Sequence, residues 1–102
     1  MAVLEKILNV LPLNEEQRRF QRVRVNLLGR YMLADRREFP CQVLDMSLSG
    51  AAIACDQVPE TGTLITLGKT PSRVVRHIEN GFAVEFTRMQ HPDFLEENVT
   101  GP

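Results

Sequence analysis

The sequence predicts a small, mainly all-β protein whose antiparallel strands form a barrel or a sandwich. Three observations support this fold class: about six short segments alternate apolar and polar residues, turn residues recur between them, and no long helical pattern separates the strands. The chain has 102 residues, 43% hydrophobic and 25% charged, which is typical of one globular domain. It has no apolar run near the ~18 residues that span a bilayer and no signal-peptide pattern, so we expect a cytoplasmic protein without a membrane span.

The first two predicted strands flank a polar turn at residues 34–37. Residues 22–33 alternate basic or polar side chains with apolar ones, which predicts a strand, and we expect Gly29 to mark a bulge or bend in it. Residues 39–45 alternate in the same way. Because Pro40 has no N–H to donate to a ladder, this second strand is expected to start at an edge or a bulge.

The remaining strands are short and separated by clear turn signals. Polar turns are predicted at residues 45–50 and 59–62, and Asn80-Gly81 is a typical hairpin signal. The four predicted strands cover residues 51–55, 64–67, 73–78 and 82–86.

Helices are expected only at the two ends of the chain. Residues 3–11 place leucine and isoleucine at helical spacing, and residues 14–17 have the pattern of a capped helical turn. The first helix would cover one end of the domain or pack in a homodimer. A docking or membrane-surface helix is disfavoured because the apolar face is short and the polar face lacks an excess of Lys and Arg. We therefore assign residues 1–17 to an N-terminal helical extension and residues 18–102 to the β-domain, which ends in a short helix opened by residues 91–93.

Arginine is concentrated near the start of the predicted domain. Residues 17–37 hold seven arginines and one acid, a local charge of +6 in a chain of net charge −1. Arginine has a planar fork that binds phosphate oxygens and base edges through paired hydrogen bonds. The segment is either a site for a phosphate-bearing partner or a solvated basic face.

No pattern of catalytic or metal-binding residues is present. The chain lacks the GxSxG, HExxH, P-loop and CxxC motifs, and its carboxylates are scattered. Cys41 and Cys55 lie 14 positions apart without a histidine at ligand spacing, which favours free thiols in a reducing compartment over a zinc site. We predict no enzyme activity, no metal and no cofactor.

Two segments have the chemistry of a ligand site. In the turn at residues 45–50, Asp45 can accept from an N–H-rich edge such as that of guanine, and Ser47 lies two residues further on. Gly50 would supply either a positive φ or close access for a ligand. Arg18 and Arg22 are four residues apart and project the same way in a helical or loosely coiled segment, where two forks can hold a phosphodiester or guanine.

Together these residues resemble the signature of the PilZ domain, the bacterial receptor domain for cyclic di-GMP. Arg18 and Arg22 match its RxxxR motif, and residues 45–50 match DxSxxG. Residues 81–86 resemble the last core strand of the family, and the resemblance extends over about residues 18–88. It implies a six-stranded antiparallel β-barrel with short flanking helices.

The resemblance also implies a ligand and roles for individual residues. Arg18 and Arg22, with Arg19, would grip the phosphates and guanine faces of cyclic di-GMP. Asp45 and Ser47 would bind a guanine. The arginine segment would close over the ligand and so change the surface that a protein effector meets, in the flagellar or exopolysaccharide machinery.

Two further positions follow from the same resemblance. Gly50 would keep the turn open. Many family members carry an aromatic residue, often Trp, on the penultimate strand, whereas this chain has no Trp and matches Arg76 to that position. A guanidinium also stacks on base planes, so Arg76 is expected to stack on guanine, with a solvent-facing strand residue as the alternative.

Two other functions stay open at this point. The domain could be a PilZ-like interaction module that binds no nucleotide, although such members usually lose one of the two motifs. It could also be a β-barrel that binds nucleic acid through the basic segment. Nucleic acid is disfavoured because only Phe20 and Tyr31 lie near that segment as stacking rings.

Overall fold

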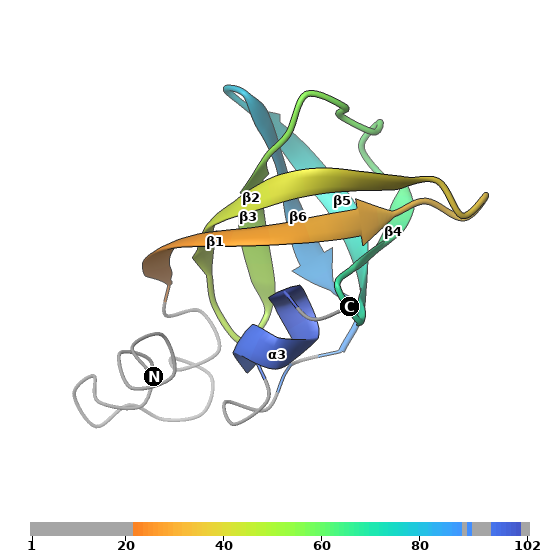
Figure 1. Cartoon of the computed structure of the whole chain (residues 1–102). Coiled ribbons are helices and arrows are strands. Elements are labelled where there is room, and N and C mark those ends of the chain that lie inside the picture. The colour runs from red at the N-terminus through yellow and green to blue at the C-terminus, as the bar shows by residue number, and fades with distance from the viewer. Residues whose placement is uncertain (1–21, 89, 91–94, 101–102) are drawn as a thin grey trace.

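The chain folds into a closed barrel of antiparallel strands in the order β1-β2-β3-β6-β5-β4 (Figure 1). A computed structural model describes residues 22–88, 90 and 95–100. The barrel confirms the predicted all-β class and decides against the sandwich. The six strands of the described part are β1 (Val23–Met32), β2 (Glu38–Met46), β3 (Gly50–Ala54), β4 (Leu64–Leu67), β5 (Thr70–Ile78) and β6 (Gly81–Phe86).

The helices predicted at residues 3–11 and 14–17, and with them Arg18 and Arg19, lie outside the described residues. Among the residues that are described, no helix is long and apolar enough to cross a membrane.

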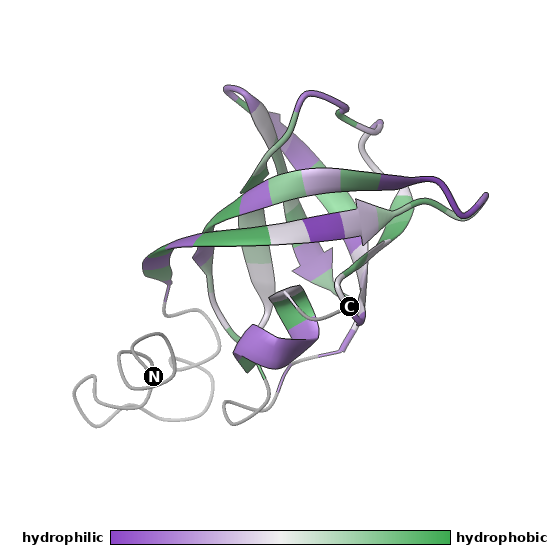
Figure 2. Cartoon of the chain, in the orientation of Figure 1, coloured by the Kyte–Doolittle hydropathy of each residue, from purple (hydrophilic) through white to green (hydrophobic). Residues whose placement is uncertain are grey.

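Alternate residues of the strands fill the barrel, because successive side chains of a strand point to opposite faces. Val43, Ile53 and Val74 come from different strands and are each 0% exposed. Tyr31 packs edge-on against Phe82, with ring centroids 5.3 Å apart. Figure 2 shows the resulting alternation of hydrophobic and hydrophilic residues along the strands. The period-two pattern of the sequence therefore reflects strands with an apolar side inside the barrel and a polar side outside it.

The barrel is closed by a short pairing between β1 and β4, which is called the seam below. The pairs Tyr31↔Leu67 and Met32↔Thr66 join these strands at the end of β1. Helix α3 (Leu95–Thr100) contacts both strands beside this seam (Figure 1). The predicted C-terminal helix is thus confirmed over Leu95–Thr100, whereas residues 91–93, which were expected to open it, lie outside the described residues.

Helix α3 is anchored by apolar side chains and by its backbone. Leu95 and Val99 are both 0% exposed. The Asn98 carbonyl accepts hydrogen bonds from Lys69 N at 2.7 Å and from Thr70 Oγ1 at 3.0 Å. These bonds satisfy a carbonyl of the last helical turn, which has no partner within the helix.

The bulge predicted at Gly29 is wrong. Gly29 pairs with Cys41 in regular register, and the irregularity of β1 lies between Arg24 and Leu27. A Cβ at Gly29 would make ordinary contact at 3.6 Å with the Val99 carbonyl of α3. The glycine therefore lies where the helix approaches the strand and not at a break in the ladder.

The fifth strand begins earlier than predicted, at Thr70 instead of residue 73. Gly68 has a φ of +60° and starts a two-residue turn that joins β4 directly to β5. Pro71 has no N–H to donate, but its carbonyl accepts the N–H of Thr87 at 3.0 Å.

The hairpin between β5 and β6 is confirmed, but Gly81 has another role than the turn signal suggests. The positive φ of 67° belongs to Asn80, and Gly81 is the first residue of β6, paired with Ile78. A Cβ at Gly81 would overlap the carbonyl oxygen of Ile53. Glycine is thus required by the close approach of β3 to β6.

Candidate ligand-binding site

Two residues of the predicted motifs meet on the outer surface of the barrel. Arg22 directly precedes β1, and Asp45 lies near the end of β2. Arg22 Nη1 donates to Asp45 Oδ1 at 2.5 Å, and the two side chains are 43% and 29% exposed. The structure therefore joins the second arginine of RxxxR to the aspartate of DxSxxG, which are 23 residues apart in the chain.

A β-bulge turns Asp45 outward. Val43 is a core residue with 0% exposure, so regular alternation would point Asp45 into the barrel as well. The register of β2 and β3 shifts between these residues, because Val43 pairs with Ile53 and Asp45 pairs with Ala52. The extra residue, Leu44, reverses the faces and places the carboxylate at the surface.

The turn after β2 is held by the side chain of Ser47. Its hydroxyl accepts from Ser49 N and Gly50 N, both at 3.2 Å, and the Ser47 N–H donates to the Gly50 carbonyl at 2.9 Å. Ser47 is only 1% exposed. In this conformation the serine of DxSxxG shapes the turn that follows Asp45.

Gly50 is required by packing and not by its backbone angle. Gly62 and Gly68 are the glycines with positive φ in the described part of the chain, so a positive φ at Gly50 is wrong. A Cβ at Gly50 would lie 2.4 Å from the Val84 carbonyl oxygen of β6, closer than real Cβ atoms approach. The glycine of the motif lets β3 pair tightly with β6.

The strand registers place Asp45 in a row that crosses the barrel. The pairs Arg24↔Asp45, Asp45↔Ala52, Ala52↔Ala83 and Ala83↔Arg76 follow one another from β1 to β5. Paired residues of neighbouring strands point to the same face. The row therefore starts with an arginine and a carboxylate, continues over two small side chains and ends with a second arginine.

Arg76 faces outward for the same reason as Asp45. Val74 is in the core and the register of β5 shifts between Val74 and Arg76, with Val75 as the extra residue. From Asp45 to Arg76 the row covers three interstrand steps, ~14 Å at ~4.8 Å each. Arg76 is exposed and forms no ion pair with another described residue.

Sequence reasoning missed three members of this row, namely Arg24, Ala52 and Ala83. Arg24 was visible only as one of the seven arginines of the basic segment and as a polar position of the first strand. Both alanines looked like ordinary residues of short strands. Their place beside Asp45 depends on the registers of three strand pairs, which sequence alternation does not determine.

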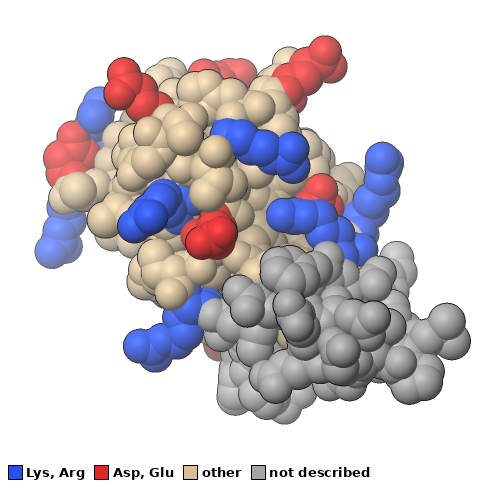
Figure 3. Space-filling view, turned by 180° about the vertical axis from the view of Figure 1, so that it is seen from behind, with Lys and Arg blue, Asp and Glu red and all other residues tan. Residues whose placement is uncertain are grey.

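Three arginines of the basic segment are paired with acidic side chains in the described part of the chain. Besides Arg22, Arg30 Nη1 lies 3.4 Å from Glu38 Oε1, and Arg37 Nε lies 2.7 Å from Asp35 Oδ2. On the face shown in Figure 3, the described basic and acidic side chains are interspersed and form no continuous basic patch. On this face, the described side chains therefore do not form the broad positive surface expected of a nucleic-acid binder.

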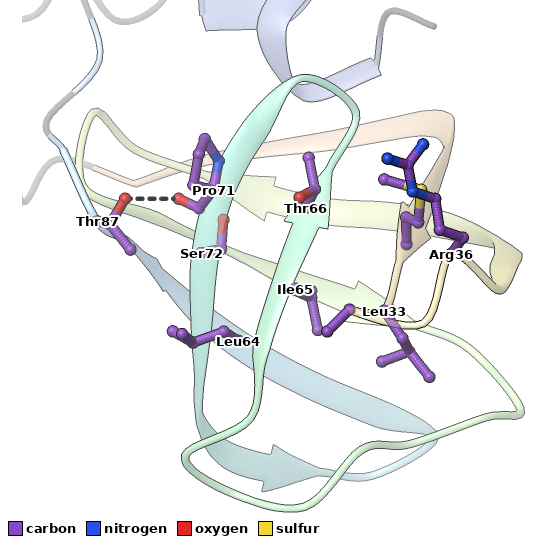
Figure 4. Close-up of a pocket in the computed structure, with 10 residues that line it drawn as sticks. Leu33, Arg36, Leu64, Ile65, Thr66, Pro71, Ser72 and Thr87 are labelled. Atoms are coloured by element: carbon purple, nitrogen blue, oxygen red, sulfur yellow. Dashed lines mark hydrogen bonds between the residues drawn. The ribbon is translucent and has the colours of Figure 1, made fainter.

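A concave feature lies at the opposite end of β1. A mainly apolar groove of about 270 Å³ is lined by β4, the start of β5 and the loop after β1, including Leu64, Ile65 and Arg36 (Figure 4). Arg24 and Met32, at the two ends of β1, are separated by roughly 25 Å of extended strand. The groove is therefore not part of the site around Asp45. No cluster of metal-ligating side chains occurs among the described residues.

The fold is a small closed β-barrel, and two of the predicted motif residues, Arg22 and Asp45, meet on its outer wall. The family model of the PilZ domain matches residues 16–99, which includes both sequence motifs and all six strands. The chain therefore belongs to the PilZ domain family, a family of ligand-binding regulatory domains that receive cyclic di-GMP. No curated protein matches the chain.

Proposed function

We propose that this protein is a receptor for cyclic di-GMP that binds the nucleotide on the outer wall of its barrel. The observation that carries the proposal is the meeting of Arg22 and Asp45 at 2.5 Å, at one end of a row that leads over two alanines to Arg76. Cyclic di-GMP offers two phosphates and two guanines, which are complementary to arginine forks and to a carboxylate respectively.

Asp45 is proposed to accept hydrogen bonds from the adjacent N–H donors of a guanine. Arg22, together with Arg18 and Arg19, would bind phosphate and guanine. In the structure Arg22 is paired with the carboxylate of Asp45. Binding would break this ion pair and replace it with charge-assisted hydrogen bonds from Arg22 to the nucleotide and from the nucleotide to Asp45. The pair is partly solvated, and such pairs contribute little to stability, so the exchange would cost little.

The other side chains of the row would complete the surface. Ala52 and Ala83 have no atoms beyond Cβ, but they are only 7% and 1% exposed, so a flat base would reach them only if the groups that cover them move. Arg76 would stack its guanidinium on a guanine, in place of the aromatic residue of many relatives. Ser47 and Gly50 would act by holding the turn that presents Asp45, with direct contact of Ser47 requiring the turn to open.

The proposed output is a change of surface without catalysis. The nucleotide would fix the arginine segment against the barrel, and a protein effector would distinguish the closed from the open form. We expect the effector to belong to motility or exopolysaccharide machinery, and the protein to act in the cytoplasm.

Calorimetric titration of the full chain with cyclic di-GMP tests the proposal, with GTP and a linear dinucleotide as controls. We expect selective micromolar or tighter binding. Asp45→Asn should weaken it more than tenfold, because it removes a charged acceptor worth ~1.5–3 kcal/mol. Asp35→Asn is the matched control, since Asp35 is also ion-paired with an arginine but lies in the β1–β2 turn.

Each other outcome has a definite meaning. Equal affinity of the Asp45→Asn and wild-type proteins would refute the assigned site. Absence of binding at millimolar nucleotide would refute the receptor function and favour the interaction module. Salt-sensitive binding of RNA or DNA without selectivity for cyclic di-GMP would favour the nucleic-acid alternative.

A further inference from the structure

The two cysteines lie directly opposite one another on neighbouring strands. Gln42 pairs with Ala54 and Val43 with Ile53 in the antiparallel ladder of β2 and β3. One step further along the same register, Cys41 faces Cys55. Both cysteines belong to the apolar interior, Cys41 as a core residue and Cys55 as a half-buried side chain packed against the core.

The backbone hydrogen bonds show whether Cys41 and Cys55 form a hydrogen-bonded or a non-hydrogen-bonded pair of the antiparallel ladder. Cys55 N donates to the Asn80 carbonyl at 3.0 Å, on the side of β3 that faces away from β2. Cys41 and Cys55 are thus a pair without mutual backbone hydrogen bonds, for which the Cα atoms lie ~4.5 Å apart and the side chains are closest. That spacing is within the range of ~4.4–6.8 Å that disulfides require.

The two thiols share a local environment. Cys55 Sγ donates to the carbonyl of Pro40, the neighbour of Cys41, at 3.3 Å. Burial raises the pKa of Cys41, and the nearby Cys55 raises it further. Burial also raises the pKa of Tyr31, with both cysteines as additional causes. Such coupling requires that the groups lie close together.

A path for a reagent exists on the Cys55 side. A groove of about 470 Å³ is lined by Cys55, Asp56, His77 and the β5–β6 turn. Cys41, in contrast, is only 6% exposed. A small molecule would therefore meet Cys55 first.

From this geometry we infer that Cys41 and Cys55 are a thiol-disulfide modification site, which low-molecular-weight disulfides of the glutathione type oxidise to a cross-strand disulfide. The Cys55 thiolate attacks the reagent, forms a mixed disulfide and releases one thiol. Cys41 loses its proton to solvent and attacks the Cys55 sulfur, which forms the protein disulfide and expels the second thiol. Two protein thiols are oxidised while one disulfide is reduced to two thiols.

The bond would close a loop of 15 residues that contains the whole turn of the candidate site, from Asp45 to Gly50. Cross-linking the two strands restricts the unfolded chain and resists opening of this hairpin. The inference depends on the ladder and the thiols alone. It therefore holds or fails independently of nucleotide binding.

The test treats the reduced, full-length, folded protein with oxidised glutathione and determines its intact mass after acid quenching. We expect a product that has lost two hydrogens and carries no adduct, a Cys41–Cys55 linked peptide after digestion, and full reversal by dithiothreitol. The oxidised protein should also unfold at a Tm higher by the order of 10 °C. Cys41→Ala should instead keep one glutathione on Cys55, because the resolving thiol is gone.

Three results would overturn the inference. They are a wild-type protein that stays fully reduced, one that accumulates the glutathione adduct as its stable product, and one that forms only disulfides between two chains. These results are read from the wild-type protein, so they do not depend on whether a cysteine variant folds. A lower Tm of the oxidised form would show that the folded hairpin does not accommodate the bond.

Discussion

Gly50→Ala is expected to destabilise the barrel strongly, although it adds one methyl group at a residue of the ligand motif. The new Cβ would lie 2.4 Å from the Val84 carbonyl oxygen, whereas ordinary contact begins at 3.4 Å, so β3 and β6 must separate locally by about 1 Å. Overpacking of this kind costs ~1–3 kcal/mol. The separation also strains the hydrogen bond from Phe86 N to Ser49 O, 2.8 Å long, and a lost bond costs ~0.5–1.5 kcal/mol.

The sum is a loss of about 1.5–4.5 kcal/mol in the free energy of unfolding, or a fall in Tm on the order of 10 °C for a domain of this size. Urea denaturation followed by circular dichroism measures it. Gly29→Ala is the matched control, because a Cβ there meets its neighbours at 3.6 Å or more, and its stability should stay within about 1 kcal/mol of the wild type. Equal stability of both variants would refute the packing role of Gly50 and favour the alternative that this glycine gives a ligand close access.

Three further outcomes are expected. Arg22→Ala should cost less than ~1 kcal/mol of unfolding free energy in urea titrations, because its ion pair with Asp45 is 43% and 29% exposed; a larger loss would make the pair structural. Burial and the neighbouring Cys55 raise the pKa of Tyr31, the chain's single tyrosine, above its ordinary value of 10.0, so the tyrosinate absorbance should rise at higher pH in the folded than in the urea-unfolded chain. The stability contributed by Tyr31 is then complete below pH 10 and is lost as the pH rises towards the folded-state pKa, whereas identical titrations would contradict the burial argument. Burial raises the pKa of Cys41 to about 12, so iodoacetamide at pH ~8 should label Cys55 first in the reduced protein, as peptide masses would show; equal rates would contradict this order.

The strands were predictable because the alternation of apolar and polar residues that marks them is a local feature of the sequence. Period-two alternation reflects one buried and one solvated face, and it located all six strands with errors only near their ends. The largest error was the start of β5, which begins at Thr70 instead of residue 73 because the turn after β4 has only two residues. The turn at Asn80 was found from residue type, since asparagine tolerates a positive φ.

The site was predictable only in part, because its assembly is not local. The motif residues Arg22 and Asp45 were identified from the resemblance, and the structure brings these two together. Arg24, Ala52 and Ala83 were missed because a register is a property of two strands and cannot be obtained from either one alone. Arg18, Arg19 and the N-terminal helices remain predictions.

The bulges explain how the barrel presents charged residues from strands that also fill its core. Without the extra residue Leu44, Asp45 would follow Val43 into the apolar interior, and without Val75, Arg76 would follow Val74. Burying an unpaired charge costs far more than the ladder bonds that a bulge disrupts. The charged side chains and the bulges therefore stabilise the same register. A one-residue slip of β2 or β5 is disfavoured because it would bury the charge of Asp45 or Arg76. The two bulges thus fix the two ends of the row, with Asp45 and Arg76 on one wall, before any ligand is present.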